Sequence, residues 1–186
     1  MIVVDRTRKT THARADIRCF DAEGRLKWEE KGVQNIWHDE GELYLLSLAF
    51  ATAYSGYGSP TVSNMYLGLD ARGSLAEANT LASLSGEPSG DGYSRQALST
   101  GGTGLAGQDF VISQPSAAYQ AKSKTVTFQA SGGDWSAVTN AFLCTHATAT
   151  TSGQGQRLLC SLALSTSRTL LDGDSLQVDM TIGISE

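Results

Sequence analysis

The feature that most constrains this chain is a single helical pattern in a sequence otherwise typical of strands and loops. Residues 39–54 carry apolar side chains around most of a helical circumference, and glycines follow them. Asp39 is a suitable N-cap, and Glu40 and Glu42 place negative charge in the first turn, where the helix dipole favours it. Because little polar surface remains, the sequence predicts a buried α-helix over about residues 39–54.

The charge distribution separates a short basic part from an acidic body. Residues 1–31 hold eight Lys/Arg and six Asp/Glu, whereas residues 32–186 hold six and thirteen. An acidic body argues against a nucleic-acid partner. The start of the sequence has no signal-peptide core, and no stretch approaches the roughly 18 apolar residues of a membrane span. We therefore expect a protein that is made in the cytosol and does not enter a membrane.

The first twelve residues combine an apolar tip with a basic, Thr-rich run. We predict that residues 1–12 form an extended arm that becomes ordered on a neighbouring subunit or another protein. The alternative is a frayed chain end without a role. Apolar side chains would enter a groove or add a strand to a sheet edge, and basic side chains would face acidic groups. The predicted contact residues of this arm are Ile2, Val3, Val4, Arg6, Arg8 and Lys9.

The rest of the chain, residues 13–186, is predicted to form a single β-rich domain. Alternating polar and apolar residues indicate a hairpin over 13–31, and after the helix the main β region runs over 64–186. The final strand is the clearest, with apolar residues at every second position from Leu176 to Ile184. Many short strands with turns between them predict a mainly β fold, an antiparallel β-sandwich or jelly-roll-like barrel, with one helix.

No residue pattern predicts a reaction, a metal or a cofactor. His12, His38 and His146 lie far apart and outside metal-ligand spacing. Free, buried thiols are predicted for Cys19, Cys144 and Cys160, and the pairing of Cys144 with Cys160 stays open but is disfavoured in a reducing compartment.

Further candidate motifs have simpler explanations. Asp70 and the run 172–174 (DGD) lack the dense oxygen ligands that calcium needs and are typical of turns. The glycines of 101–104 are not followed by a lysine and a helix, so a phosphate loop does not fit. Four tyrosines flank loops and fit either a binding surface or, more commonly, the rim of a core. They are Tyr54, Tyr57, Tyr66 and Tyr93.

Four short patterns carry a family resemblance. They are residues 33–36 (VQNI) with Gly41 and 43–46; 65–69 (MYLGL); 90–96 (GDGYSRQ); and 141–143 with 158–164, 168–170 and 172–174. In these patterns the chain resembles small virion proteins of tailed bacteriophages, which act as capsid decoration (cement) proteins or as tail-associated structural proteins. The resemblance implies a non-enzymatic protein located in the virion, with no catalytic or cofactor-binding residues to carry over.

The resemblance also implies partners. We expect a decoration protein that stabilises the shell by binding neighbouring major capsid protein subunits, with other virion proteins as further partners and a homo-oligomer, a trimer by resemblance. The alternative is a tail or tail-fiber component, including one that binds a receptor. A carbohydrate-active enzyme is disfavoured, since no carboxylate pair suggests itself. Residues 138–144 are apolar on both faces, so either the sandwich or a neighbouring subunit must cover the second face.

Overall fold

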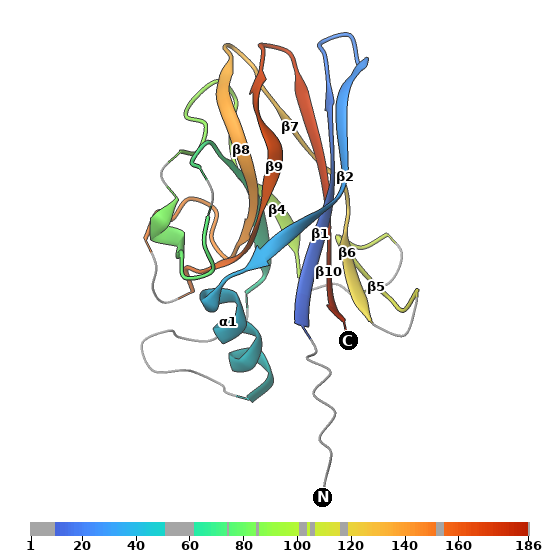
Figure 1. The fold of residues 1–186 in the computed structure, drawn as a ribbon, viewed down its shortest axis with the longest axis vertical. Helices are drawn as coiled ribbons and strands as arrows, with labels where there is room; N and C mark the ends of the chain where they lie inside the picture. Colours follow the sequence, from blue (N-terminus) through green and yellow to red (C-terminus); the bar gives the residue numbers. More distant parts are fainter. Residues whose placement is uncertain are drawn as a thin grey trace, which may run out of the picture.

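The computed structural model of the chain describes residues 10–50, 62–73, 75–84, 86–100, 104, 107–115, 119–151 and 155–185. Within these residues the chain forms ten β-strands, one α-helix and one short 3-10 helix (Figure 1). In chain order the elements are β1 (Thr10–Phe20), β2 (Leu26–Trp37), α1 (Asp39–Phe50), β3 (Asn64–Asp70), η1 (Leu81–Ser83), β4 (Gln96–Ser99), β5 (Phe110–Ser113), β6 (Gln120–Ser123), β7 (Val126–Gln129), β8 (Trp135–Cys144), β9 (Leu158–Leu170) and β10 (Ser175–Ser185).

The strands pair antiparallel and curve into a nearly closed barrel. Their order is β4-β3-β8-β9-β2-β1-β10-β6-β5, and β7 pairs with β10 next to β6. The order begins at β4 and ends at β5, so these two short strands are its edges, and β4 contacts β7 across the open seam. The predicted fold class, a mainly β antiparallel sandwich or barrel with one helix, is confirmed.

Strand β2 joins the two halves of the barrel. Its first part pairs with β1, from Leu26 opposite Phe20 to Gln34 opposite Arg14, and its last three residues pair with β9 instead. The β1–β2 hairpin therefore extends beyond the predicted range of 13–31. Because β1 begins at Thr10, the last three residues of the arm predicted over 1–12 belong to the sheet. Residues 1–9 lie outside the described residues.

The barrel interior is filled by alternate residues of the strands. Ile17 of β1 faces Val178 of β10, and both side chains are fully buried. Cys19, Cys144 and Cys160 are buried and free, as predicted. Burial raises the pKa of the first two thiols to about 11 and that of Cys160 to about 12, which keeps all three protonated and unreactive at neutral pH.

A second apolar layer covers the outer face of β8. Leu143 belongs to the main core, whereas its neighbour Phe142 packs in a separate cluster under the segment between β3 and β4. That segment is irregular, with a 3-10 turn at Leu81–Ser83. Both faces of β8 are thus covered by this chain, and residues 138–144 provide no reason for a subunit contact. The outer cluster comprises Leu75, Leu81, Leu84, Phe142, Cys144 and Leu158.

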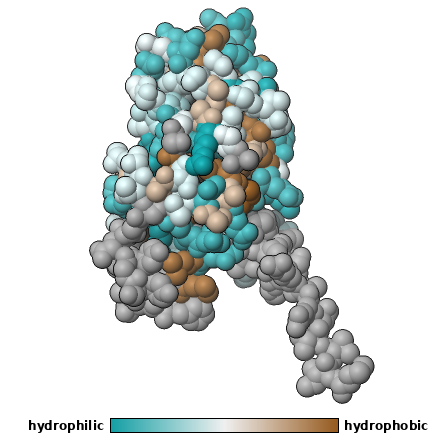
Figure 2. Space-filling view, turned by 60° about the vertical axis from the view of Figure 1, so that its left-hand side comes forward, coloured by the Kyte–Doolittle hydropathy of each residue, from teal (hydrophilic) through white to brown (hydrophobic). Residues whose placement is uncertain are grey.

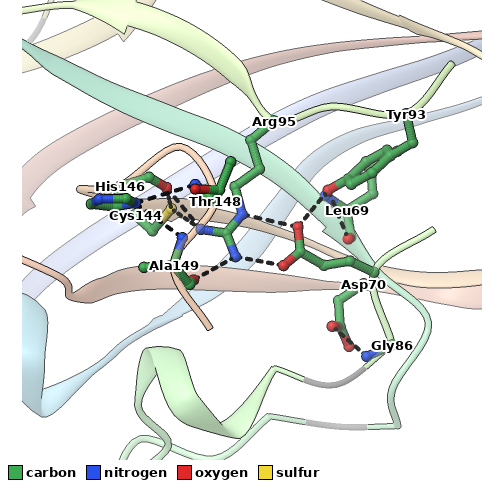
Figure 3. A network of polar contacts seen from close by, with 10 residues as sticks. Leu69, Asp70, Gly86, Tyr93, Arg95, Cys144, His146, Thr148 and Ala149 are labelled. Atoms are coloured by element: carbon green, nitrogen blue, oxygen red, sulfur yellow. Dashed lines mark hydrogen bonds and ion pairs between the residues drawn. The ribbon is translucent and has the colours of Figure 1, made fainter. Parts of the chain in front are cut away.

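Arg95 holds this outer layer in place from within (Figure 3). Its guanidinium donates to both carboxylate oxygens of Glu87, at 2.9 and 2.5 Å, and to the backbone carbonyls of His146 and Ala149, at 2.7 and 3.0 Å. It also lies 5.2 Å from the centre of the Phe142 ring. One buried side chain therefore ties the loop before β4 to the loop after β8.

Two residues singled out in the sequence have structural roles in the same region. The buried carboxylate of Asp70 accepts hydrogen bonds from the backbone N–H groups of Arg72 and Gly86, at 2.8 and 3.1 Å, which supports the turn interpretation. Tyr93 packs edge-on against Trp135, with ring centres 5.5 Å apart, and its hydroxyl accepts the Leu69 N–H. Tyr93 therefore belongs to the rim of the core.

Replacing Arg95 by Met should destabilise the fold by about 3–5 kcal/mol, because it leaves the Glu87 carboxylate and two carbonyls without their partner in a buried place. Arg25→Met is the matched control, since the Arg25 side chain is 74% exposed and its ion pairs are of the kind that contribute at most about 1 kcal/mol. Urea unfolding of both variants measures the difference. Equal losses of stability in the two variants would contradict the role given to Arg95.

Candidate functional site

Helix α1 follows β2 directly and lies at one end of the barrel (Figure 1). Its N-cap is His38, whose carbonyl oxygen accepts hydrogen bonds from the N–H groups of Gly41 and Glu42, at 2.8 and 3.0 Å. The prediction that Asp39 is the N-cap is therefore wrong by one residue. The helix is described from Asp39 to Phe50, and the remaining predicted helical residues, 51–54, lie outside the described residues.

The side chain of His38 is buried where α1 meets β9. Its Nδ1 lies 3.1 Å from the carbonyl oxygen of Glu77, and its Nε2 lies 2.8 Å from the hydroxyl of Ser161. Because a carbonyl can only accept, Nδ1 carries the proton of the neutral ring and Nε2 accepts from the hydroxyl. Burial lowers the pKa of His38 below its ordinary value of 6.5, so the ring is neutral at pH 7.

The first turn of α1 is also fixed by Glu40 and Gly41. One carboxylate oxygen of Glu40, which is buried, accepts the N–H groups of Leu81 and Leu158, at 2.9 and 2.8 Å. At Gly41 the helix backbone lies so close to β9 that a Cβ would come within 2.3 Å of the carbonyl oxygen of Leu159. Polar contacts and close backbone packing therefore hold the start of the helix against the barrel.

The outward side of α1 is exposed, which corrects the prediction of a buried helix. Tyr44 is buried, but Leu45, Leu46 and Leu48 are 37%, 58% and 43% exposed. Figure 2 shows apolar surface at this end of the molecule. We call this region the apolar end; it comprises the pocket described next and the exposed side chains of Ile36, Leu45, Leu46, Leu48 and Ile112.

A pocket of about 320 Å³ opens between α1 and the open seam of the barrel. Its walls come from the end of β2, the starts of β3 and β9, the edge strand β5, and the last part of β10. The indole Nε1–H of Trp37, a buried donor in this lining, makes no hydrogen bond to any residue that the structure describes. Apolar walls of this kind suit the apolar side chains of an extended peptide segment. The lining includes Trp37, Tyr44, Met65, Phe110, Ala121 and Ile182.

The structure places only some of the residues singled out in the sequence. The predicted arm contacts lie outside the described residues, as do Tyr54, Tyr57 and residues 101–103; the arm contacts are Ile2, Val3, Val4, Arg6, Arg8 and Lys9. Tyr66 is half-buried against the outer apolar cluster. His146 lies in the turn after β8, where Nδ1 accepts the Ala149 N–H at 3.0 Å.

The part of the chain that the structure describes contains neither a candidate metal site nor a candidate membrane-spanning helix. Among these residues no group of three or more His, Cys, Asp or Glu side chains is placed to hold a metal ion. None of the helices described there has the length and apolar character needed to cross a membrane.

Replacing Gly41 by Ala should cost about 1–3 kcal/mol of stability, because the added methyl group would force the helix away from the β9 backbone. In a helix that made no such contact, Ala would instead stabilise by up to about 1 kcal/mol. Gly73→Ala is the control, since a Cβ there meets nothing within 4 Å. Thermal unfolding of both variants distinguishes the two cases, and a stabilised Gly41 variant would contradict the observed docking.

His38 should make the protein less stable as the pH falls below about 6.5. The unfolded chain binds a proton at this ordinary pKa, whereas the buried ring has a lowered pKa and stays neutral. The stability contribution is therefore complete above pH 6.5 and is lost as the pH falls towards the folded-state pKa. The slope from one proton is at most about 1.4 kcal/mol per pH unit.

Urea unfolding between pH 7.5 and 5.5 measures this slope for the wild type and for His38→Gln. The slope should be smaller in His38→Gln and kept in His146→Gln, the control that removes a half-buried histidine from a turn. A wild-type slope that His38→Gln leaves unchanged would show that another group causes it.

Comparison with known proteins then places the chain in a family. The family model described as podophage GP4 fiber I protein gp80 matches residues 50–182, which is most of the chain. A search of curated proteins and a search of solved structures each found no match. The match agrees with the resemblance to virion proteins of tailed bacteriophages noted in the sequence. The chain belongs to the family of podophage GP4 fiber I protein gp80 and is a structural protein of a tailed-phage virion.

Proposed function

We propose that this protein is a tail-associated, fiber-type component of the virion that acts by holding proteins together and not by catalysis. The observation that carries the proposal is the family match, because the family is described as a fiber protein. That description supports the tail or tail-fiber alternative over the capsid decoration protein that the sequence favoured. Synthesis in the cytoplasm of the host bacterium is part of the same proposal.

The two ends of the barrel differ in polarity, which supports attachment of the protein through one of them. The apolar end carries exposed leucines and the pocket, which favours contact with another protein surface. At the opposite end lies the β1–β2 turn, where the Asp21 carboxylate accepts the backbone N–H groups of Glu23 and Arg25, at 3.1 and 2.8 Å. We infer that the apolar end faces the virion and the turns face outward.

The partners we propose are other virion proteins and further copies of this chain. A homo-oligomer, with a trimer as the first expectation, rests on the resemblance stated above. The physical reason for expecting an oligomer now lies in a different part of the surface. Residues 138–144 are covered within the chain, whereas the apolar end offers the unpartnered apolar surface that an oligomer contact would bury.

Labelling of intact virions tests the location. An epitope inserted in the exposed turn at Glu23 should be bound by antibody, and electron microscopy should show the label at the tail or its fibers. Virions without the epitope control for antibody that binds elsewhere. Label spread over the capsid faces would overturn the tail assignment in favour of a decoration protein. Absence of the chain from virions, by mass spectrometry, would overturn both.

A further inference from the structure

We propose that the pocket of the apolar end binds the N-terminal segment of a neighbouring copy of this chain, with the apolar side chains of Ile2 and Val4 inside it. The proposal deepens the proposed function, since it states how copies of a virion structural protein are joined. Residues 1–9 lie outside the described residues, so the inference rests on the pocket, on where β1 begins, and on the sequence of the segment.

The size and chemistry of the pocket fit this occupant. An apolar cavity of about 150 Å³ holds a molecule the size of benzene, so a pocket of about 320 Å³ has room for two aliphatic side chains. Three consecutive β-branched residues favour an extended backbone, in which alternate side chains point the same way. Ile2 and Val4 would then enter the pocket together, and Val3 would face the rim beside Leu45, which is 37% exposed.

The register of β1 places the segment at the correct end of the molecule. Ala13 pairs with Ile182, which lines the pocket, and Thr10 pairs with Ser185 at the end of β10. Strand β1 therefore starts beside the pocket wall and runs away from it, so the chain before Thr10 leaves the barrel at the apolar end. Nine extended residues span up to about 30 Å, which is enough to reach the same end of an adjacent copy.

The sequence of the segment favours a neighbouring pocket over its own. To enter its own pocket the chain would have to reverse direction soon after leaving the barrel, and tight reversals are made mainly by Gly, Pro, Asn, Asp and Ser. Asp5 is the one residue of these types among residues 2–9. A turn there would leave residues 6–9 extended outward for about 13 Å, and the short apolar tip would return only to the level of Thr10.

Charge gives a second, independent match. The segment carries Arg6, Arg8 and Lys9 against a single acidic side chain, Asp5, whereas residues 32–186 hold thirteen acidic and six basic residues. Asp39 and Glu42 are exposed acidic side chains in the first turn of α1, the helix whose Tyr44 and Leu45 line the pocket. A basic run that follows an apolar tip therefore suits a body of opposite charge.

Disulfide trapping in the full chain tests the proposal directly. The three native cysteines are buried, so two introduced cysteines report on each other. Val3→Cys is combined with Leu45→Cys, which stands in the pocket wall, and the control pair is Val3→Cys with Glu23→Cys at the opposite end. Mild oxidation of the purified protein and of virions that carry each pair should give covalent oligomers for Val3/Leu45 and at least fivefold less for the control.

Three outcomes would overturn the proposal. A Val3/Leu45 chain that migrates as an oxidised monomer would show that the segment binds its own pocket. No disulfide in either sample would show that the segment does not reach a pocket. A disulfide between Leu45→Cys and a different virion protein would give the pocket another occupant. Because trapping does not depend on where the label lies in the virion, its failure is separate from failure of the tail assignment.

Deleting residues 2–9 gives a second measurement. The deletion stops before Thr10, so the pairing of β1 with β10 stays intact, and the unfolding temperature of the isolated chain should be unchanged. Light scattering at micromolar concentration should show self-association in the full chain and at least tenfold weaker self-association after the deletion. Val4→Asp should weaken it to a similar extent, whereas the control Thr7→Ser should not. Equal association of all four proteins would contradict the assigned role.

Discussion

Strand β8 is buried on both faces, and much of the structure follows from that constraint. A sheet covered on one side only would leave Phe142 in water, so the chain must supply a second layer. That layer is irregular backbone, whose polar groups need partners when buried. Arg95 supplies hydrogen-bond donors in this layer, to two backbone carbonyls and one carboxylate. The outer face of β8 is thereby closed to other subunits, and contact surfaces must lie elsewhere.

The two ends of the barrel are unequal because the strands close differently at each. The end of β4 is joined to the residue before β5 by a side-chain contact, in which Asp109 accepts the Ser99 N–H at 2.8 Å. Helix α1 crosses the apolar end but is held mainly through its first turn, by His38, Glu40 and Gly41. Anchoring at one end of an apolar helix leaves the following leucines exposed, and the space between helix and seam is the pocket.

Period-two patterns were sufficient to predict the strands whose two faces differ. Strand β10 is the best example, with Leu176 and Val178 buried and Gln177 between them only partly buried.

The helix was predicted from its caps and spacing, but the exposure of its outward side was not. An apolar circumference shows that a helix needs partners, and it does not show whether they belong to the same chain. The pocket could not be predicted either, since its walls come from strands far apart in sequence. The one signal in the sequence was that three of the four residues 45–48 are leucines, more than one side of a helix can direct at a core.

The family match begins at Phe50, so β1, β2 and the residues that anchor α1 stand before it. Yet β1 lies between β2 and β10 in the sheet, and β2 connects to β9. Removing them would expose the full edge of β10 and the three residues of β9 that pair with β2, and exposed strand edges favour aggregation. The matched region is therefore not a closed barrel by itself in this chain. Residues 10–49 complete the barrel and also build the apolar end, which couples the closing of the fold to the surface through which we propose that copies are joined.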